Sequence, residues 1–195
     1  MLDAAIECIL ELGYYKTSTN EIARRAGVTW GTLQYQFGTR EALLIAVLND
    51  RWEALQHTVR DADLKGATLE ERIAEVLDVL ATYYGVPEHL AQLQILLDLT
   101  HNSDTSDDVR RAVTAHGRHL VRAWKPLFAR ALGDAAQDAD LVRYAFTALR
   151  GYLTGRVISS RISDTRDDRI TRHLVVRGVA CAIREEAATR GLRVD

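Results

Sequence analysis

The fold is decided by residues 18–37, which read STNEIARRAGVTWGTLQYQF. Ser18 and Glu21 have the spacing of a capping box, in which the hydroxyl accepts from one free amide and the carboxylate from another. This box predicts a short helix that ends at Gly27, where Thr29 then predicts the cap of a second short helix. Two short helices joined by a tight glycine turn are typical of a helix-turn-helix.

The rest of the chain also predicts helices and shows no strand-like alternation. Apolar residues recur at helical spacing before Gly13, which predicts a first helix over residues 2–12. Further amphipathic stretches, bounded by caps, glycines or Pro87, predict helices near 39–55, 68–84, 87–99, 106–132, 139–160 and 166–189. We therefore predict an all-α fold of about nine helices, with a three-helix head, residues 1–45, and a larger helical body, residues 46–195.

Charge is unevenly distributed along the chain. The net charge is −2, yet residues 14–40 hold four cations against Glu21, a local excess of +3 that leaves −5 elsewhere. A basic patch on an acidic body suits a protein that contacts phosphates with one end only. Chance clustering on a solvated face is the alternative interpretation.

Composition favours a cytoplasmic protein. No run of about 18 uncharged apolar residues is present, so we expect no membrane span. The residues after Met1 lack the basic and apolar segments of a signal peptide. Cys8 and Cys181 lie in predicted helices and are interpreted as buried, reduced thiols.

The second helix of the predicted helix-turn-helix is expected to bind DNA. An α-helix fits the major groove and reaches base edges with its N-terminal residues. Gly31 would let the backbone approach closely, and Arg40 would clamp a phosphate at the start of the next helix. Trp30 either packs on a thymine methyl or sugar, or folds back beside Leu33. The polar side chains expected to contact bases or backbone are Thr17, Ser18, Asn20, Thr29, Thr32, Gln34, Tyr35 and Gln36.

About the first fifty residues resemble the N-terminal motif of the TetR (tetracycline-repressor) family of transcriptional regulators. The matching positions are Leu2-Asp3-Ala4-Ala5, Gly13-Tyr14, Thr17-Ser18, Glu21-Ile22-Ala23, Ala26-Gly27-Val28, Gly31-Thr32-Leu33, Phe37 and Arg40-Glu41-Ala42-Leu43. The family usually has Tyr where this chain has Gln34, and His or Tyr where it has Gln36. These differences would change the backbone contacts and operator preference, and Tyr35 could assume part of that role. The given residues lack the basic arm that often precedes the first helix, so either affinity for DNA is lower or the true start lies upstream.

The resemblance implies a homodimer that binds a palindromic DNA operator, with half-sites about 34–36 Å apart. It also implies that the last two helices of each subunit pair. Candidate interface residues are Tyr144, Ala148, Gly151, Leu174, Gly178 and Cys181. A small-molecule effector in the body would shift the helix that joins body to head, and repression relieved by that ligand is the usual sense in the family. Activation stays open.

The body is expected to bind a largely apolar effector. Core packing is the simpler interpretation of its aromatic residues, but together they could line a cavity. The candidate pocket residues are Tyr83, Tyr84, Leu93, Leu97, His116, Leu120, Trp124, Phe128, Phe146 and Tyr152. His116 and His119 lack the further ligands that a metal needs, so we expect no metal and no cofactor.

Two rival interpretations differ in class from a ligand-released repressor. The first is an enzyme or small-molecule carrier whose helix-turn-helix is only architectural. The absence of a phosphate loop, nucleophile elbow or carboxylate pair in the sequence argues against an enzyme. The second is a regulator without a ligand, which acts through a protein partner.

Overall fold

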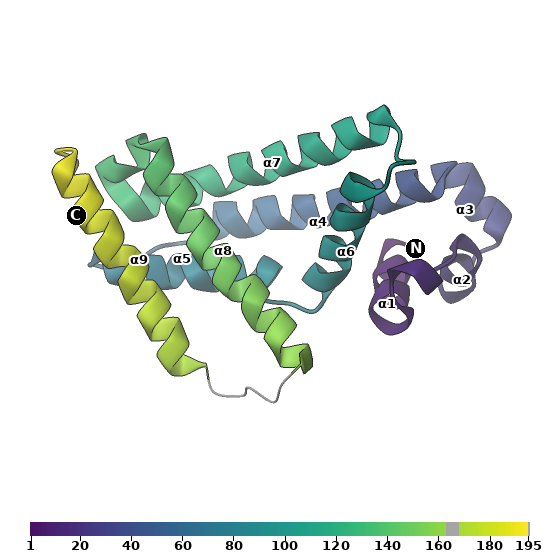
Figure 1. Ribbon diagram of the computed structural model, residues 1–195, viewed down its shortest axis with the longest axis horizontal. Coiled ribbons are helices and arrows are strands. Elements are labelled where there is room, and N and C mark those ends of the chain that lie inside the picture. Colours follow the sequence, from purple (N-terminus) through teal and green to yellow (C-terminus); the bar gives the residue numbers. More distant parts are fainter. Residues whose placement is uncertain (163–167, 195) are drawn as a thin grey trace. The chain divides into compact units, whose positions relative to one another are not determined.

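The structure, a computed structural model, describes residues 1–162 and 168–194, except for the side chains of residues 51–54. Within these residues the regular structure consists of nine α-helices and two 3-10 helices, without any strand (Figure 1). The predicted all-α fold is thereby confirmed. The start expected for the last helix, residue 166, lies outside the described residues.

Packing divides the chain into two compact units, Met1–Leu55 with Pro87–Val121 and Gln56–Val86 with Arg122–Asp195. The first unit contains α1 (Leu2–Leu12), η1 (Tyr14–Lys16), α2 (Thr19–Arg25), α3 (Trp30–Phe37) and α6 (Glu88–His101). The second contains α5 (Leu69–Tyr84), η2 (Gly133–Gln137), α8 (Ala139–Ile162) and α9 (Arg169–Thr189). Two long helices contribute residues to both units, α4 (Arg40–Asp61) and α7 (Asp107–Leu132).

The turns of the first unit follow the capping groups and glycines of the sequence. Ser18 accepts from the amide of Glu21 at 3.2 Å and begins α2. Gly27 then turns the chain with a φ of 66°, a backbone conformation that residues other than glycine rarely adopt. Thr29 accepts from the amide of Thr32 at 3.1 Å and begins α3. The predicted helix-turn-helix is therefore formed by these local interactions.

One apolar core holds the first unit together. It combines buried residues of α1, α2 and α3 with the first half of α4, and it extends to α6 and α7. Its members include Ile6, Ile9, Ile22, Leu33, Leu43, Leu44, Val47, Leu48, Ile95, Leu99 and Val113. Because α1 packs against α6, packing does not divide the chain at residue 45, where sequence analysis placed the boundary between head and body.

The second unit is built on α5, α8 and α9. α8 and α9 lie side by side, and both pack on α5 (Figure 1). A capping box of Thr68 and Glu71 begins α5, as its sequence predicts. Arg72 donates from Nε to the carbonyl of Ala131 at 2.9 Å and from a terminal nitrogen to the carbonyl of Val194 at 2.5 Å. These bonds hold the end of the chain on the unit.

None of the described helices combines the length and the apolar composition that crossing a membrane demands.

Candidate nucleic-acid interface

α3 presents a row of exposed side chains to solvent. Tyr35 is 95% exposed and Trp30 is 51% exposed, whereas Leu33 on the opposite face is buried. Gly31, Thr32, Gln34 and Gln36 are exposed as well. Of the two orientations considered for Trp30, the exposed one is observed. The buried Leu33 anchors the helix from behind, so its outer face is available to a partner.

The N-terminus of α3 is fixed by two threonines. The Thr29 hydroxyl lies 2.9 Å from the Thr32 hydroxyl, in addition to its bond with the Thr32 amide. A Cβ added to Gly31 would meet only the Thr29 hydroxyl, at 3.7 Å, which is ordinary contact. Nothing within the described chain therefore requires a glycine there, which is consistent with a role in close approach to a partner.

Gln34 is partly engaged within the protein. Its side-chain amide donates to the carbonyl of Gly38 at 2.5 Å, at the C-terminal end of α3. The side-chain oxygen of Gln34 has no such bond, so it is the atom left to accept from a partner. Gln34 thus stabilises the corner between α3 and α4 as well as facing solvent.

Ser18 and Asn20 lie at the exposed front of α2, as predicted. Thr17 does not. It is only 3% exposed, and its hydroxyl donates to the carbonyl of Gly13 at 2.9 Å. The predicted DNA contact by the Thr17 side chain is wrong, because both its surface and its hydrogen bond are used within the fold.

Arg40, expected to clamp a phosphate, is bound to Tyr14. One terminal nitrogen donates to the Tyr14 hydroxyl at 3.0 Å and the other to the Tyr14 carbonyl at 3.1 Å. The guanidinium also lies 4.4 Å from the centre of the Tyr14 ring, a cation–π arrangement. Arg40 therefore holds η1 to the start of α4, and its contact with phosphate stays a prediction.

The basic residues of α2 are paired with acidic ones. Arg24 and Arg25 both donate to Glu21, and Arg25 also bonds Glu11 at 2.6 Å. Hydrogen bonds from Arg24 and then Arg25 lower the pKa of Glu21 to about 2. The local excess of positive charge is thus partly neutralised, and α3 offers hydroxyl, amide and aromatic groups rather than cations.

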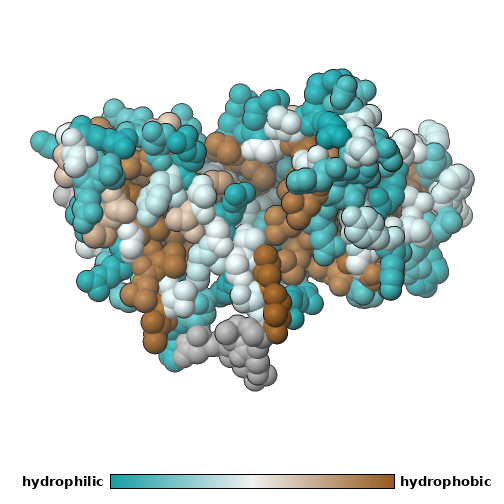
Figure 2. Space-filling view, viewed as in Figure 1, coloured by the Kyte–Doolittle hydropathy of each residue, from teal (hydrophilic) through white to brown (hydrophobic). Residues whose placement is uncertain are grey.

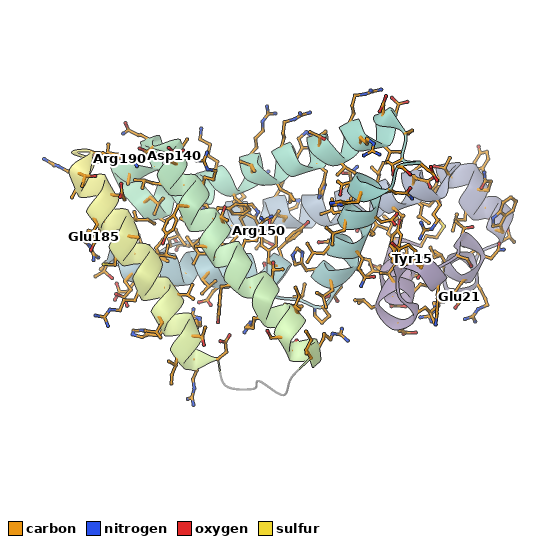
Figure 3. The ribbon with its side chains drawn as sticks, viewed as in Figure 1. Tyr15, Glu21, Asp140, Arg150, Glu185 and Arg190 are labelled. Atoms are coloured by element: carbon orange, nitrogen blue, oxygen red, sulfur yellow. The ribbon has the colours of Figure 1, made fainter. Side chains whose placement is uncertain are left out.

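The predicted pocket residues of the second unit form a packed aromatic cluster. Trp124, Tyr84 and Phe128 are buried. Tyr83 contacts Tyr84 and Trp124 edge-on, and Phe146 contacts Tyr84 and Phe128 in the same way. The guanidinium of Arg150, labelled on α8 in Figure 3, lies 5.4 Å from the Phe146 ring centre. These side chains pack against one another as core residues do, and their role in lining a ligand pocket stays a prediction.

Tyr152 makes its hydrogen bond to a residue outside that aromatic cluster. Its hydroxyl donates to Asp168 at 2.5 Å, near the start of α9. Burial, and then the hydrogen bond to the Asp168 carboxylate, raise the pKa of Tyr152 to about 12. Tyr152 therefore ties α8 to the N-terminal end of α9.

The remaining pocket candidates belong to the first unit and differ in exposure. His116 is buried, Leu93 and Leu120 are half-buried, and Leu97 is 58% exposed. Leu97 lies on an open surface groove with Tyr15 and His101, and its role in binding a ligand stays a prediction. α6 buries Ala91, Ile95 and Leu99 and leaves the Leu97 side to solvent.

The predicted interface residues lie on the outer surfaces of α8 and α9. Tyr144 and Leu174 are exposed, as are Gly151, Gly178 and Cys181, and Ala148 is half-buried. Hydrophobic side chains gather along both helices in Figure 2, and exposed Ile158, Ile162 and Ile170 join them. Cys8 is buried as expected, but Cys181 is exposed and its thiol donates to Glu185 at 3.3 Å.

His116 and His119 do not share an exposed face, since His116 is buried and His119 is exposed. Across the described residues no group of three or more His, Cys, Asp and Glu side chains gathers as a set of metal ligands.

Comparison with known proteins finds similarity to regulators of transcription. The sequence model of "Bacterial regulatory proteins, tetR family" matches residues 1–47. The fatty acid metabolism regulator protein of Bacillus subtilis is 31% identical over 77 residues, 40% of each chain. The transcriptional regulator LmrA of the same species is 24% identical over 161 residues, 82% of this chain and 84% of its own.

A solved structure resembles the whole described fold. The fatty acid regulator FadR of Bacillus subtilis, in complex with stearoyl-CoA, superimposes with a TM-score of 0.65 at 19% identity. The match covers 93% of this chain and 95% of FadR. An exposed polar helix in a helix-turn-helix, followed by further packed helices, is the arrangement expected of a DNA-binding regulator of transcription. The N-terminal residues and the fold are thus similar to those of TetR-family regulators.

Proposed function

We propose that this chain is a ligand-responsive transcriptional repressor that binds a palindromic operator as a homodimer. The observation that carries the proposal is the exposed face of α3. Tyr35, Trp30 and Thr32 project from a helix whose opposite face is anchored by buried Leu33. Hydroxyl, amide and aromatic groups are the types that read base edges and contact sugar and phosphate in the major groove.

The dimer is proposed to form through α8 and α9. Exposed Tyr144 and Leu174 provide apolar surface on the two helices. Cβ atoms added to Gly151 and Gly178 would meet nothing within 4 Å, so a second backbone has room to approach closely there. A two-fold interface uses the same patch on both subunits. The patch proposed here has exposed apolar side chains on both α8 and α9.

The effector is proposed to be a largely apolar small molecule. The relative FadR is known in complex with stearoyl-CoA, which makes a long-chain acyl thioester a reasonable probe. Buried His89, Gln92 and His116 supply polar groups in the first unit that could orient such a molecule. For release, the effector must favour the geometry that does not bind DNA, typically by about 1–3 kcal/mol.

A direct test of DNA binding selects duplexes from a random pool with the full-length chain. We expect an enriched palindrome, and native mass spectrometry should find two chains on each duplex. Affinity should fall steeply with salt, because phosphate contacts release counterions. Failure to enrich any sequence would contradict the proposal and favour a carrier or enzyme with an architectural helix-turn-helix.

A second measurement tests the ligand response. Stearoyl-CoA is titrated into the complex with the selected duplex, and fluorescence anisotropy follows release. Release at micromolar probe supports an acyl-type effector. If the complex stays intact while the protein also fails to bind the probe in calorimetry, an acyl-type effector is excluded and other small molecules or a protein partner become the candidates.

A further inference from the structure

The first unit contains a three-residue link between α6, η1 and α4. The Tyr14 hydroxyl donates to a carboxylate oxygen of Asp98 on α6 at 2.7 Å. The same hydroxyl accepts from Arg40, the first residue of α4, at 3.0 Å. Tyr14 is only 5% exposed, whereas Asp98 and Arg40 are half-buried. These residues are far apart in sequence, since Tyr14 and Asp98 are separated by 84 in residue number.

The two hydrogen bonds of the link run in one direction, from the Arg40 guanidinium through the Tyr14 hydroxyl to the Asp98 carboxylate. The hydroxyl lies between a cation, from which it accepts, and an anion, to which it donates. Hydrogen bonds to charged groups are shorter and stronger than neutral ones, and bonds in series strengthen one another. Burial, and then the bond to Asp98, raise the pKa of Tyr14 to about 12. The hydroxyl therefore keeps its proton, and with it the bond to Asp98, at physiological pH.

Arg40 connects the link to the recognition helix. α3 ends at Phe37, and Gly38 turns the chain with a φ of 74°. Thr39 then accepts from the Ala42 amide at 3.1 Å at the start of α4. The short corner from α3 to Arg40 is stiffened by the bond from Gln34 to the Gly38 carbonyl. Fixing the Arg40 guanidinium therefore fixes the end of the helix that faces DNA.

We propose that Asp98 and Tyr14 are positioning residues, through which α6 sets the orientation of α3 by way of Arg40. The proposal rests on the proposed function and adds the residues that transmit a movement of α6 to the DNA-binding helix α3. A displacement of α6 would move Asp98, which would either break its hydrogen bond to the Tyr14 hydroxyl or move that hydroxyl with it. In both cases the turn between α3 and α4 would shift. No residue of the link needs to touch DNA.

The experiment is a double-mutant cycle on operator binding, using the duplex selected by the wild-type chain. Tyr14→Phe removes only the hydroxyl, and Asp98→Ala removes its acceptor. We expect each variant to bind about tenfold more weakly, or ~1.4 kcal/mol. The double variant should bind no more weakly than either single one, because both changes cut the same link.

Matched controls distinguish positioning from general damage. Tyr15→Phe is the same substitution at the neighbouring residue, whose ring is exposed, and Asp104→Ala removes an exposed carboxylate just after α6. Both should bind within about twofold of wild type, well under the tenfold that ~1.4 kcal/mol represents. Amide hydrogen exchange in the free proteins should rise across α3 in Tyr14→Phe and stay unchanged across α9.

The possible results separate two failures. A wild-type chain that selects no duplex contradicts the proposed function itself. A wild type that binds, with Tyr14→Phe and Asp98→Ala equal to it or with losses that add, overturns only the link. Lower stability with unchanged operator affinity and unchanged exchange across α3 also overturns it. Should Tyr14→Phe fail to fold, Asp98→Ala, compared with its control Asp104→Ala, decides by the same two readouts.

Discussion

The indole N–H of Trp124 donates to the hydroxyl of Tyr84 across 3.0 Å, inside the second unit. Both side chains are buried, and their ring centres lie 5.7 Å apart. An indole N–H without an acceptor in such a place would lose its hydration without compensation. Trp124 can therefore be buried because Tyr84, on another helix, supplies the oxygen.

Tyr84→Phe is expected to lower the free energy of unfolding by roughly 1–3 kcal/mol, the cost of an unsatisfied buried donor. Urea unfolding followed by circular dichroism, at one fixed protein concentration, measures the loss. Tyr35→Phe serves as the matched control, since Tyr35 is exposed and should be neutral. A Tyr84→Phe variant as stable as the wild type would show that the bond is not needed in the core.

Thr29→Ala is expected to lower the free energy of unfolding by about 0.5–2 kcal/mol, the usual contribution of an N-cap. The substitution removes the acceptor of the Thr32 amide at the start of α3. Thr29→Ser keeps a hydroxyl in that position and should restore most of the stability. Equal losses in the Ala and Ser variants would point to the methyl group of Thr29 and contradict the capping role.

His116 should make stability depend on pH. Burial, and then the charge of His119, lower the pKa of His116 below its ordinary value. Below a pH of about 6.5 an unfolded chain takes up a proton that the folded chain resists. Stability is therefore complete above that pH and falls as the pH drops through it. Urea unfolding at several values between pH 8 and pH 5 measures this slope.

Two histidine variants isolate this effect. His116→Gln should flatten the pH dependence, because a side chain without a titrating group takes its place. His57→Gln changes an exposed histidine on α4 and should leave the wild-type dependence intact. If both variants keep the same slope as the wild type, other groups cause the dependence.

If the proposed dimer forms through α8 and α9, Leu174→Asp is expected to convert it to monomers. Leu174 is 58% exposed on α9, and a carboxylate there would be buried against its symmetry mate. Sedimentation velocity measures the oligomeric state. Val121→Asp is the matched control, because Val121 is 60% exposed on α7, a helix that contributes no residue to the proposed interface. Dimers that persist in Leu174→Asp would place the interface elsewhere.

The sequence predicted the features that arise from neighbouring residues. Ser18, Thr29 and Thr68 cap helices where their spacing predicted, because a cap and its amide lie within one turn. The exposure of Tyr35 and the burial of Leu33 follow from helical periodicity in the same way. Local chemistry therefore specified the helix-turn-helix and most of its outer face.

Contacts between distant residues were not predictable from spacing. The residues around Asp98 in sequence do not predict its contact with Tyr14. Tyr14 belongs to the family motif, and that motif does not predict a partner on α6 either. Thr17 looked available because its residue type suits DNA, yet its hydroxyl bonds back to the Gly13 carbonyl. Leu97 was a candidate for the pocket, but only the face of α6 that packs on the core is covered and Leu97 is exposed.

Recognition of DNA by α3 is tested most directly by the ratio of two dissociation constants. One is for the selected duplex and the other for a scrambled duplex of equal length, both at 150 mM salt. The wild type should prefer the selected duplex by about 10³-fold or more, and Trp30→Ala with Tyr35→Ala should reduce that preference at least tenfold. A wild-type ratio near one, or a ratio that the double substitution leaves unchanged, would contradict sequence reading by this helix.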